Sequence, residues 1–185
     1  MNKTRIVLFG SPSGGGKNAI IAELIKKYPD IYTQFPSMAS RPMREGESQG
    51  NPYFFVTNEE FEKQIKSGEV FEYTTLHKDY RGMSSAIIDK YLESGKILLN
   101  DTDYIGVLAI RKKYPKISKS FFLTVPKQEL ERRIRNRGSM PEELIQHRLA
   151  NFDKEMKTAK HFDHKVENCV LDECVQEIHQ LIHNT

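Results

Sequence analysis

The chain has 185 residues and a mass of 21.5 kDa, which suits one domain with a well-buried core and leaves little room for two independent ones. Hydrophobic residues make up 38% and charged residues 29%, a balance typical of soluble globular proteins, and no apolar run approaches the ~18 residues that span a membrane. The net charge of +3 is too small to indicate a nucleic-acid partner, and the apolar start is too short for a signal peptide, so we expect a cytoplasmic protein.

The predicted elements begin with a strand, a glycine loop and a helix. "RIVLFG" (5–10) is a short apolar run that ends in glycine, which predicts a buried strand. "AIIAELIKKY" (19–28) places its apolar side chains on one helical face. The loop "GSPSGGGKNA" (10–19) therefore lies where a strand meets the N-terminus of a helix.

Between residues 37 and 83 the pattern changes to short strands around one helix. "PYFFVT" (52–57) and "VFEYTTLH" (70–77) predict strands. "NEEFEKQIKSG" (58–68) predicts a helix that begins with a capping box formed by Thr57 and Glu60. We interpret this stretch as a small insertion of mixed α and β structure.

The later chain alternates between apolar runs and helices. "KILLNDTD" (96–103) and "KSFFLTV" (119–125) predict two further buried strands, each followed by a helix-length segment. Such alternation predicts an α/β fold in which helices flank a parallel sheet. The charged segment 140–160 is predicted to be helical, and 171–183 predicts an amphipathic helix that packs back on the sheet.

Two local clusters have simple interpretations. The four arginines within 131–138 form either a solvated helix face or a clamp for several phosphates. Cys169 and Cys174 have no His or Cys partner at the spacing of metal ligands, which predicts free thiols in a reducing compartment.

Residues 10–19 resemble the phosphate-binding P-loop, whose pattern is G-x-x-x-x-G-K-[ST]. In that loop backbone amides cradle phosphates, the lysine neutralises them and the hydroxyl binds Mg²⁺. Ser11 replaces the first glycine, and Asn18 replaces the hydroxyl residue with a carboxamide oxygen on a longer arm, which can still ligate a hard cation. We expect a nucleoside triphosphate to bind at Ser13, Gly14, Gly15, Gly16, Lys17, Asn18 and Ala19.

A second motif points to one family. "SMASRPMREGESQGNPYFF" (37–55) resembles the monophosphate-binding segment of guanylate kinases, which is approximately S-x-T-T-R-x-x-R-x-G-E-x-x-G-x-x-Y-x-F. The matching positions are Ser37, Arg41, Arg44, Gly46, Glu47, Gly50, Tyr53 and Phe55. Further matches follow in the family's order over nearly the whole chain: "FEY" (71–73), "YRG" (80–82), "NDTDYIG" (100–106), "RRIRNRG" (132–138), "HRL" (147–149) and "EN" (167–168).

The resemblance implies a single guanylate-kinase-like domain. It would consist of a P-loop kinase core (1–34, 84–126 and 162–185), a small α+β monophosphate-binding region (35–83) and a helical lid (127–161). The resemblance also implies ATP as phosphoryl donor, Mg²⁺ as cofactor and GMP or dGMP as acceptor. Small-molecule nucleotides would then be the partners, and the sequence leaves monomer and homodimer both open.

The resemblance implies roles for individual residues. The catalytic set would be Lys17, Arg41, Arg133, Arg137 and Arg148. The acceptor would be bound by Ser37, Arg41, Arg44, Tyr53, Glu72, Arg81 and Asp103, since guanidiniums and a phenol suit a dianionic phosphate and a carboxylate suits the donor edge of guanine. Asn168 matches a position near the donor nucleotide. Asn18 and Asp103 are the candidate metal ligands, with Asp101 in support, and Arg132 and Arg135 would be surface charges.

Two departures fall on the acceptor side. The family normally reads "YYG" followed by serine or threonine, whereas this chain has Arg81 and Met83. Arg81 can keep a phosphate contact with added charge. Met83 cannot hydrogen-bond the guanine carbonyl, and Ser84 replaces the missing hydroxyl only if the turn slips by one residue. The hypothesis that follows is GMP phosphorylation with reduced discrimination among bases.

Two alternatives to GMP phosphorylation stay open. The first is a kinase for another phosphorylated acceptor such as ribose 1,5-bisphosphate, because that related branch tolerates a non-hydroxyl residue after the P-loop lysine. The second is a non-catalytic guanylate-kinase-like module that recognises phosphorylated protein partners. The arginine, tyrosine and glutamate set speaks against the first, and the retained Lys17, glycines and lid arginines speak against the second.

Overall fold

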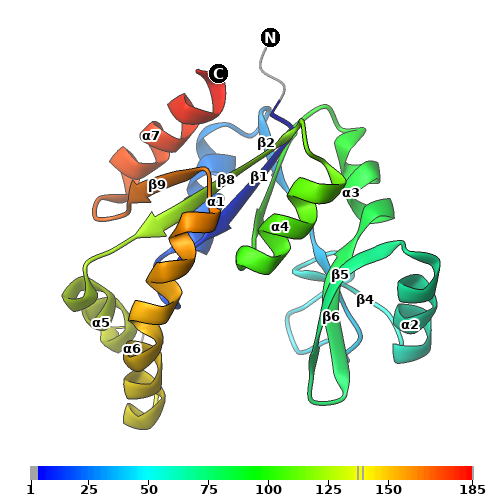
Figure 1. Ribbon diagram of the computed structural model, residues 1–185, viewed down its shortest axis with the longest axis horizontal. Helices are drawn as coiled ribbons and strands as arrows, with labels where there is room; N and C mark the ends of the chain where they lie inside the picture. Colours follow the sequence, from blue (N-terminus) through cyan, green and yellow to red (C-terminus); the bar gives the residue numbers. More distant parts are fainter. Residues whose placement is uncertain (1–3, 137, 139, 185) are drawn as a thin grey trace.

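The protein was analysed as a computed structural model that describes residues 4–136, 138 and 140–184. Within these residues, two β-sheets and seven α-helices follow one another in the order shown in Figure 1. Among the described residues, no helix is both long enough and apolar enough to cross a membrane.

The central sheet contains five strands, and every neighbouring pair is parallel. In spatial order they are β2 (Tyr32–Gln34), β7 (Ile97–Asp101), β1 (Ile6–Gly10), β8 (Ser118–Thr124) and β9 (His164–Glu167). The central strand β1 is buried along its whole length, as expected for a parallel sheet that is covered on both faces.

Four helices cover the two faces of this sheet: α1 (Lys17–Lys27) and α7 (Leu171–His183) on one, and α3 (Ser85–Leu92) and α4 (Tyr104–Lys113) on the other. Successive side chains of β1 point to opposite faces. Val7 and Phe9 pack in the cluster that includes α1 and α7, whereas Ile6 and Leu8 pack in the cluster that includes α3 and α4. The α/β fold with a parallel sheet flanked by helices, predicted from the sequence, is confirmed.

The second sheet lies at the end of the core away from the chain termini (Figure 1). Its strands in spatial order are β4 (Tyr53–Phe55), β3 (Ser37–Ala39), β6 (Asp79–Ser84) and β5 (Val70–Leu76). Helix α2 (Asn58–Ser67) packs on it through Phe61, which is fully buried against Met38 and Val70. The mixed insertion expected from the sequence is therefore present, and it contains two further strands, β3 and β6, in the middle of its sheet.

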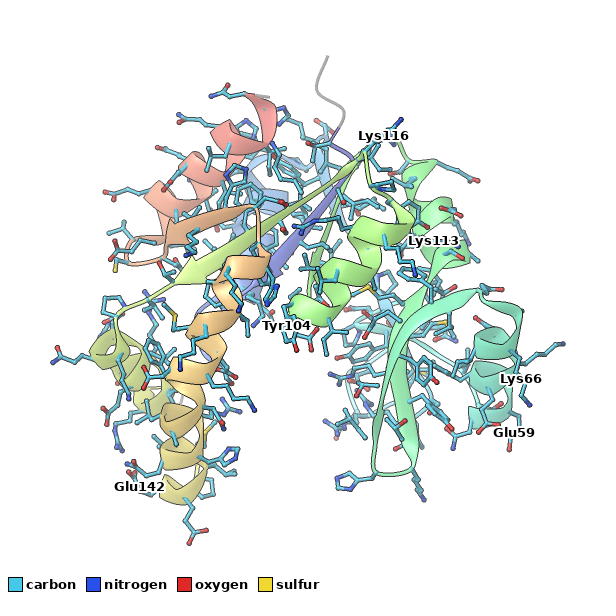
Figure 2. The ribbon with its side chains drawn as sticks, viewed as in Figure 1. Glu59, Lys66, Tyr104, Lys113, Lys116 and Glu142 are labelled. Atoms are coloured by element: carbon cyan, nitrogen blue, oxygen red, sulfur yellow. The ribbon has the colours of Figure 1, made fainter. Side chains whose placement is uncertain are left out.

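A helical hairpin extends from the same end of the core, opposite the second sheet (Figure 1). It consists of α5 (Lys127–Asn136) and α6 (Glu142–Lys157), followed by the 3₁₀ turn η1 (Thr158–His161). The two helices bury a cluster of their own: Val125, Leu130, Ile134, Ile145, Leu149 and Phe152. Glu142, in the first turn of α6, lies at the tip of the hairpin farthest from the core (Figure 2).

Three elements of the core were not predicted from the sequence: β2, β9 and α3. The two strands lie at the edges of the sheet, are only three and four residues long, and each buries a single side chain, Tyr32 in one and Val166 in the other. Such short, mostly polar stretches carry no apolar run. They are specified by pairing with β7 and β8 and not by local pattern.

The capping box at the start of α2 is confirmed and gives a stability test. Thr57 Oγ1 accepts a hydrogen bond from the Glu60 amide at 3.2 Å, and the Thr57 amide donates to Glu60 Oε2 at 2.8 Å. We predict that Thr57→Ala lowers the free energy of unfolding by about 1 kcal/mol, because one amide of the first turn loses its acceptor. Urea denaturation of Thr57→Ala and of Thr57→Ser, which keeps the hydroxyl, measures this difference. Equal midpoints for the two variants would contradict it.

Candidate active site

The P-loop connects β1 directly to α1. Gly14 and Gly16 have φ angles of +99° and +96°, a region that residues with a Cβ atom rarely adopt. Gly15 is required for a different reason, because a Cβ atom there would lie 2.7 Å from the Ser11 side chain. Ser11 Oγ donates to the carbonyl of Pro12 and accepts from Lys17 Nζ at 3.2 Å. The loop therefore closes around Ser11, the residue that replaces the usual glycine.

The register of the parallel sheet sets a second loop beside the first. Phe9 in β1 aligns with Asp101 in β7, and the Thr102 amide donates to the Phe9 carbonyl at 3.0 Å. Asp103 was expected at the end of the strand, but β7 ends at Asp101 and Asp103 is the N-cap of α4. Its Oδ1 accepts from the amides of Ile105 (2.9 Å) and Gly106 (3.0 Å). One carboxylate oxygen is thus committed to the helix.

A central cavity of about 490 Å³ opens between the P-loop, the start of α4 and the second sheet. It brings together four of the expected acceptor residues, Ser37, Glu72, Arg81 and Asp103, with Ser13 and Lys17 of the donor loop. The remaining lining residues are Ser11, Tyr73, Thr74, Gly82, Met83, Asp101, Thr102, Ile105 and Glu155. One space therefore contacts both the expected donor site and the expected acceptor site.

Glu72 projects from β5 into this cavity and is partly buried. Burial, and secondarily the negative charge of Asp103, raise the pKa of the Glu72 carboxyl above its ordinary value. A partly desolvated carboxylate gains most from an incoming pair of N–H donors, because those donors replace the water it has lost. Ser37, at the start of β3, lines the same cavity and offers a hydroxyl.

Met83 and Ser84 show how one wall of the cavity differs from the family pattern. Met83 is 4% exposed, lines the cavity and packs closely against Gly106 of α4. Ser84 is buried, and its hydroxyl donates to Glu69 Oε1 at 3.1 Å, away from the cavity. The alternative in which Ser84 replaces the missing hydroxyl is therefore wrong for this structure. At this position the cavity wall is a thioether.

Arg41, Arg44 and Tyr53 do not line the central cavity. The two arginines line a separate basic cavity of about 230 Å³ on the second sheet, and Arg81 lines both cavities. The Arg81 guanidinium carbon lies 4.6 Å from the centroid of the Tyr53 ring, within cation–π range. Arg81 therefore connects the basic cavity to the central one.

Arg41 pairs with Glu47, a residue of the 37–55 motif to which no role was assigned from the sequence. Its Nη2 and Nη1 atoms lie 2.6 Å and 2.7 Å from the two carboxylate oxygens of Glu47. These bonds, with one from the Arg44 amide, lower the pKa of Glu47 to about 2. The guanidinium is thereby fixed in the loop between β3 and β4.

Arg133, on α5, contacts the P-loop region and does not line the central cavity. Its Nε donates to Glu129 at 2.8 Å and its Nη2 donates to the Asn168 carbonyl at 2.6 Å. Asn168, which is 3% exposed, in turn donates from Nδ2 to the Gly15 carbonyl at 2.8 Å. In this conformation Arg133 and Asn168 hold the P-loop backbone.

The other arginines of the segment that was expected to form the lid have surroundings unlike those of Arg133. Arg148 lies on α6, is partly exposed and does not line the central cavity. Arg137 lies outside the described residues. Arg132 and Arg135 form exposed ion pairs with Glu129, Glu131 and Glu142 along the helices, which fits the expected solvated face.

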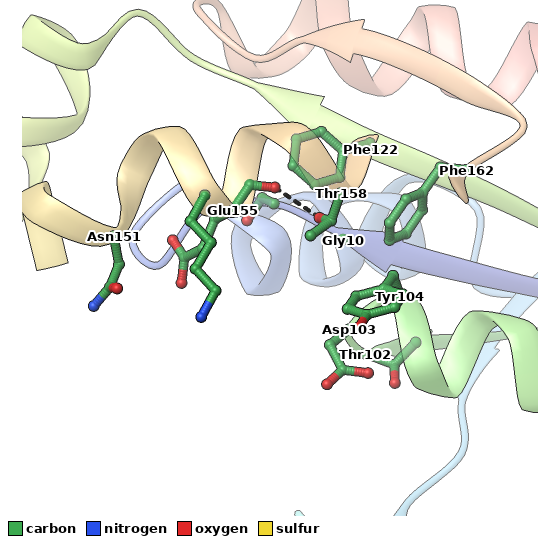
Figure 3. A pocket seen from close by; sticks show the side chains of 11 residues that line it. Gly10, Thr102, Asp103, Tyr104, Phe122, Asn151, Glu155, Thr158 and Phe162 are labelled. Carbon is green, nitrogen blue, oxygen red and sulfur yellow. Dashed lines mark hydrogen bonds between the residues drawn. The ribbon is translucent and has the colours of Figure 1, made fainter. Parts of the chain in front are cut away.

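Glu155 is a site residue that the sequence did not indicate. It lies in the last turn of α6, and its Oε2 accepts a hydrogen bond from the Ser13 amide of the P-loop at 3.0 Å. Glu155 also lines a side cavity of about 290 Å³, where Figure 3 shows it beside Asn151 and across from Thr102 and Asp103. In the sequence it is one of several acids of a charged helix, and only the fold distinguishes it.

The candidate metal ligands form a small set of oxygen donors. Asp101 and Asp103 line the central cavity beside Lys17. Asn18 and Ala19 are exposed in the first turn of α1 and do not line that cavity. Within residues 4–136, 138 and 140–184, no group of three or more His, Cys, Asp or Glu side chains could hold a metal ion. This set suits Mg²⁺ that arrives with phosphates, because Mg²⁺ commonly takes only one or two carboxylates from a protein.

Comparison with known proteins adds sequence evidence to this geometry. The family model described as guanylate kinase matches residues 2–185. A guanylate kinase from Fusobacterium nucleatum is 33% identical over 184 residues, which cover 100% of this chain and 98% of that protein. A guanylate kinase from Photorhabdus laumondii is 35% identical over 178 residues, which cover 96% and 86%.

A solved structure supports the same fold. The crystal structure of guanylate kinase from Anaplasma phagocytophilum superimposes with a TM-score of 0.71 and covers 98% of this chain and 85% of that one, at 22% sequence identity. Together with the family model and the full-length relatives, the central cavity leads to one conclusion. The chain belongs to the guanylate kinase family.

Proposed function

We propose that the protein transfers the γ-phosphoryl group of ATP to GMP and dGMP. Membership of the guanylate kinase family makes it a nucleoside monophosphate kinase, a phosphotransferase. The observation that carries the proposal is the central cavity, in which Lys17 of the P-loop shares one space with Ser37, Glu72 and Arg81. A kinase needs this arrangement, because it must hold donor and acceptor phosphates in line.

On the donor side, the phosphates of ATP would lie in the loop from Ser13 to Ala19. Its positive-φ glycines orient backbone amides inward, and the start of α1 adds its partial positive charge. Lys17 would then exchange its contact with Ser11 for one with a phosphate. Asn168 would act on the donor site by fixing the Gly15 carbonyl.

On the acceptor side, the guanine would lie between Ser37 and Glu72. The Glu72 carboxylate would accept from N1–H and the exocyclic amine of guanine, a pair of donors that adenine does not present. The monophosphate would lie near Arg81, where the central and basic cavities meet. Arg44 and Tyr53 would complete its binding, and Arg41 would contribute if Glu47 shared it with the phosphate.

In the arrangement we propose, three parts of the chain have separate roles. The core is 1–34, 84–126 and 162–185, the monophosphate-binding region is 35–83 and the lid is 127–161. Charge develops on the moving phosphoryl group, and lid arginines can neutralise it. We assign that role to Arg133, Arg137 and Arg148, which would reach the central cavity when the lid closes.

Mg²⁺ would be held mainly by the donor phosphates, with Asp103 and Asn18 contributing oxygen ligands and Asp101 in support. When bound, the ion would neutralise charge on the phosphates. We place the protein in the cytoplasm, where its proposed substrates occur, with small-molecule nucleotides as partners and not nucleic acid. Its two cysteines are free thiols, Cys169 exposed and Cys174 buried.

The acceptor can be tested directly. We expect ATP-dependent ADP formation with Mg²⁺ to be fastest with GMP and dGMP in a panel that also contains IMP, AMP, UMP and ribose 1,5-bisphosphate. Because Met83 offers no hydrogen bond to a carbonyl on the base, we expect AMP, which lacks that carbonyl, to be used with a smaller penalty than a hydroxyl at this position would impose. Preference for ribose 1,5-bisphosphate would overturn the proposal, and so would GMP binding without any turnover.

Glu72 gives a prediction for the base. Glu72→Gln should lower kcat/KM for GMP by a factor of roughly 10 to 200, because one of the two guanine donors meets an amide N–H in place of an acceptor. Steady-state kinetics with GMP measure the loss, and Glu69→Gln, at a carboxylate that accepts from Ser84 and does not line the cavity, is the matched control. Equal kcat/KM in the Glu72 variant and the wild type would remove Glu72 from the base site.

Asn18 gives a prediction for the metal. Asn18→Ser should lower the Mg²⁺ concentration for half-maximal rate, since a hydroxyl directly on the first turn of α1 is a shorter ligand than a carboxamide. A titration of rate against free Mg²⁺ at fixed ATP and GMP checks this, with Asn18→Ala as the control that supplies no oxygen. An unchanged Mg²⁺ requirement in both variants would show that the ion is held without this side chain.

A further inference from the structure

The P-loop is hydrogen-bonded to a carboxylate of the protein itself, that of Glu155. Ser13 lies in the middle of the loop, and its amide donates to the Glu155 carboxylate at 3.0 Å. Ser13 and Glu155 both line the central cavity beside Lys17. Amides of this loop are the groups that hold phosphates, so the carboxylate lies where a phosphate oxygen would accept the same hydrogen bond.

Glu155 reaches the loop from the base of the lid. It lies in the last turn of α6, where Thr158 Oγ1 donates to the Glu155 carbonyl at 2.7 Å (Figure 3). The next residue, Met156, packs against the core cluster that contains Ala159 and Phe162. The backbone that carries Glu155 is therefore anchored, and its carboxylate is held against Ser13 by position as well as by charge.

A bound donor changes this arrangement. A polyphosphate and a carboxylate repel each other over a few ångströms, and a single amide hydrogen cannot serve both well. Asp101 and Asp103 line the same cavity, which adds to the negative charge that an incoming phosphate meets. Lys17 lines the same cavity, and its ammonium contacts Ser11 Oγ.

We propose that Glu155 is an affinity-setting residue of the donor site, which competes with a phosphate of the donor for the Ser13 amide and lowers donor affinity. The inference rests on the proposed function, because it assigns the P-loop to the donor. It has a structural consequence. Donor binding displaces the carboxylate and removes one hydrogen bond between α6 and the P-loop, while the backbone of this turn of α6 stays anchored to the core.

The test compares anion binding in Glu155→Gln and the wild type. Glutamine keeps an oxygen that can accept from Ser13 but removes the charge. Isothermal titration with ADP and with pyrophosphate, both without Mg²⁺, should give dissociation constants about fivefold lower in Glu155→Gln, the factor expected for loss of one unit charge ~4 Å away in water. Asp153→Asn, an exposed acid two residues earlier on α6, is the matched control and should bind both ligands like the wild type.

Glu155→Asp provides a second variant that retains the charge but shortens the arm. Its dissociation constants should lie between those of the wild type and Glu155→Gln. Unchanged or higher dissociation constants for both ligands in Glu155→Gln would overturn the inference, because Glu155 would then orient the loop for the phosphate and not compete with it. Pyrophosphate has no nucleoside, so its dissociation constant reports on the P-loop alone. Tighter pyrophosphate binding in a protein that does not phosphorylate GMP would support the role of Glu155 and defeat the proposed function.

Discussion

The alignment of β1 with β7 is the constraint on which the site depends. Because the two strands are parallel and adjacent, their carboxyl ends meet at one edge of the sheet, and the Thr102 amide donates directly to the Phe9 carbonyl. A shift of the register by one residue would turn the apolar side chains of β1 to the wrong face, so the two buried clusters enforce it. The P-loop and Asp103 are close for this reason and not through any contact of their own.

The expected acceptor residues Ser37 and Glu72 are positioned by the strand order of the second sheet. The second sheet is mostly antiparallel, and β6 lies between β3 and β5, so that Ser37 and Glu72 reach the cavity from either side of it. The chain places an arginine and a methionine on β6 at positions where the family has polar uncharged groups. Arg81 adds charge beside the Tyr53 ring, and Met83 adds apolar contact with α4. In the acceptor site that we propose, Arg81 would strengthen binding at the phosphate and Met83 would remove a hydrogen bond at the base.

Much of the fold and of the candidate site was predictable from the sequence. Whether an element could be predicted depended on whether a local pattern or a distant partner specifies it. The P-loop, the capping box at Thr57 and the helices α5 and α6 are local patterns, and the family prediction, which rested on the motif at 37–55 and the matches that follow it, is confirmed. The edge strand β9 was missed because its stability comes from β8, more than forty residues away. The contacts of Ser84 and Glu155 were missed for the same reason. The partner of each side chain is distant in the sequence, so the residues next to the side chain do not indicate it. Arg41 was identified by its motif, but its ion pair with Glu47 was not.

The buried bond between Asn168 and the Gly15 carbonyl joins residues separated by 153 positions. During synthesis, the side chain that fixes the P-loop backbone is made 153 residues after the carbonyl that it binds. Domains assemble as the chain is made, at roughly 5 to 20 residues per second. The P-loop backbone therefore lacks this hydrogen bond until Asn168 has been made, and a nascent chain that stops short of β9 has the loop without it. The geometry of the loop after the first strand is thus completed by the residue that follows the last strand.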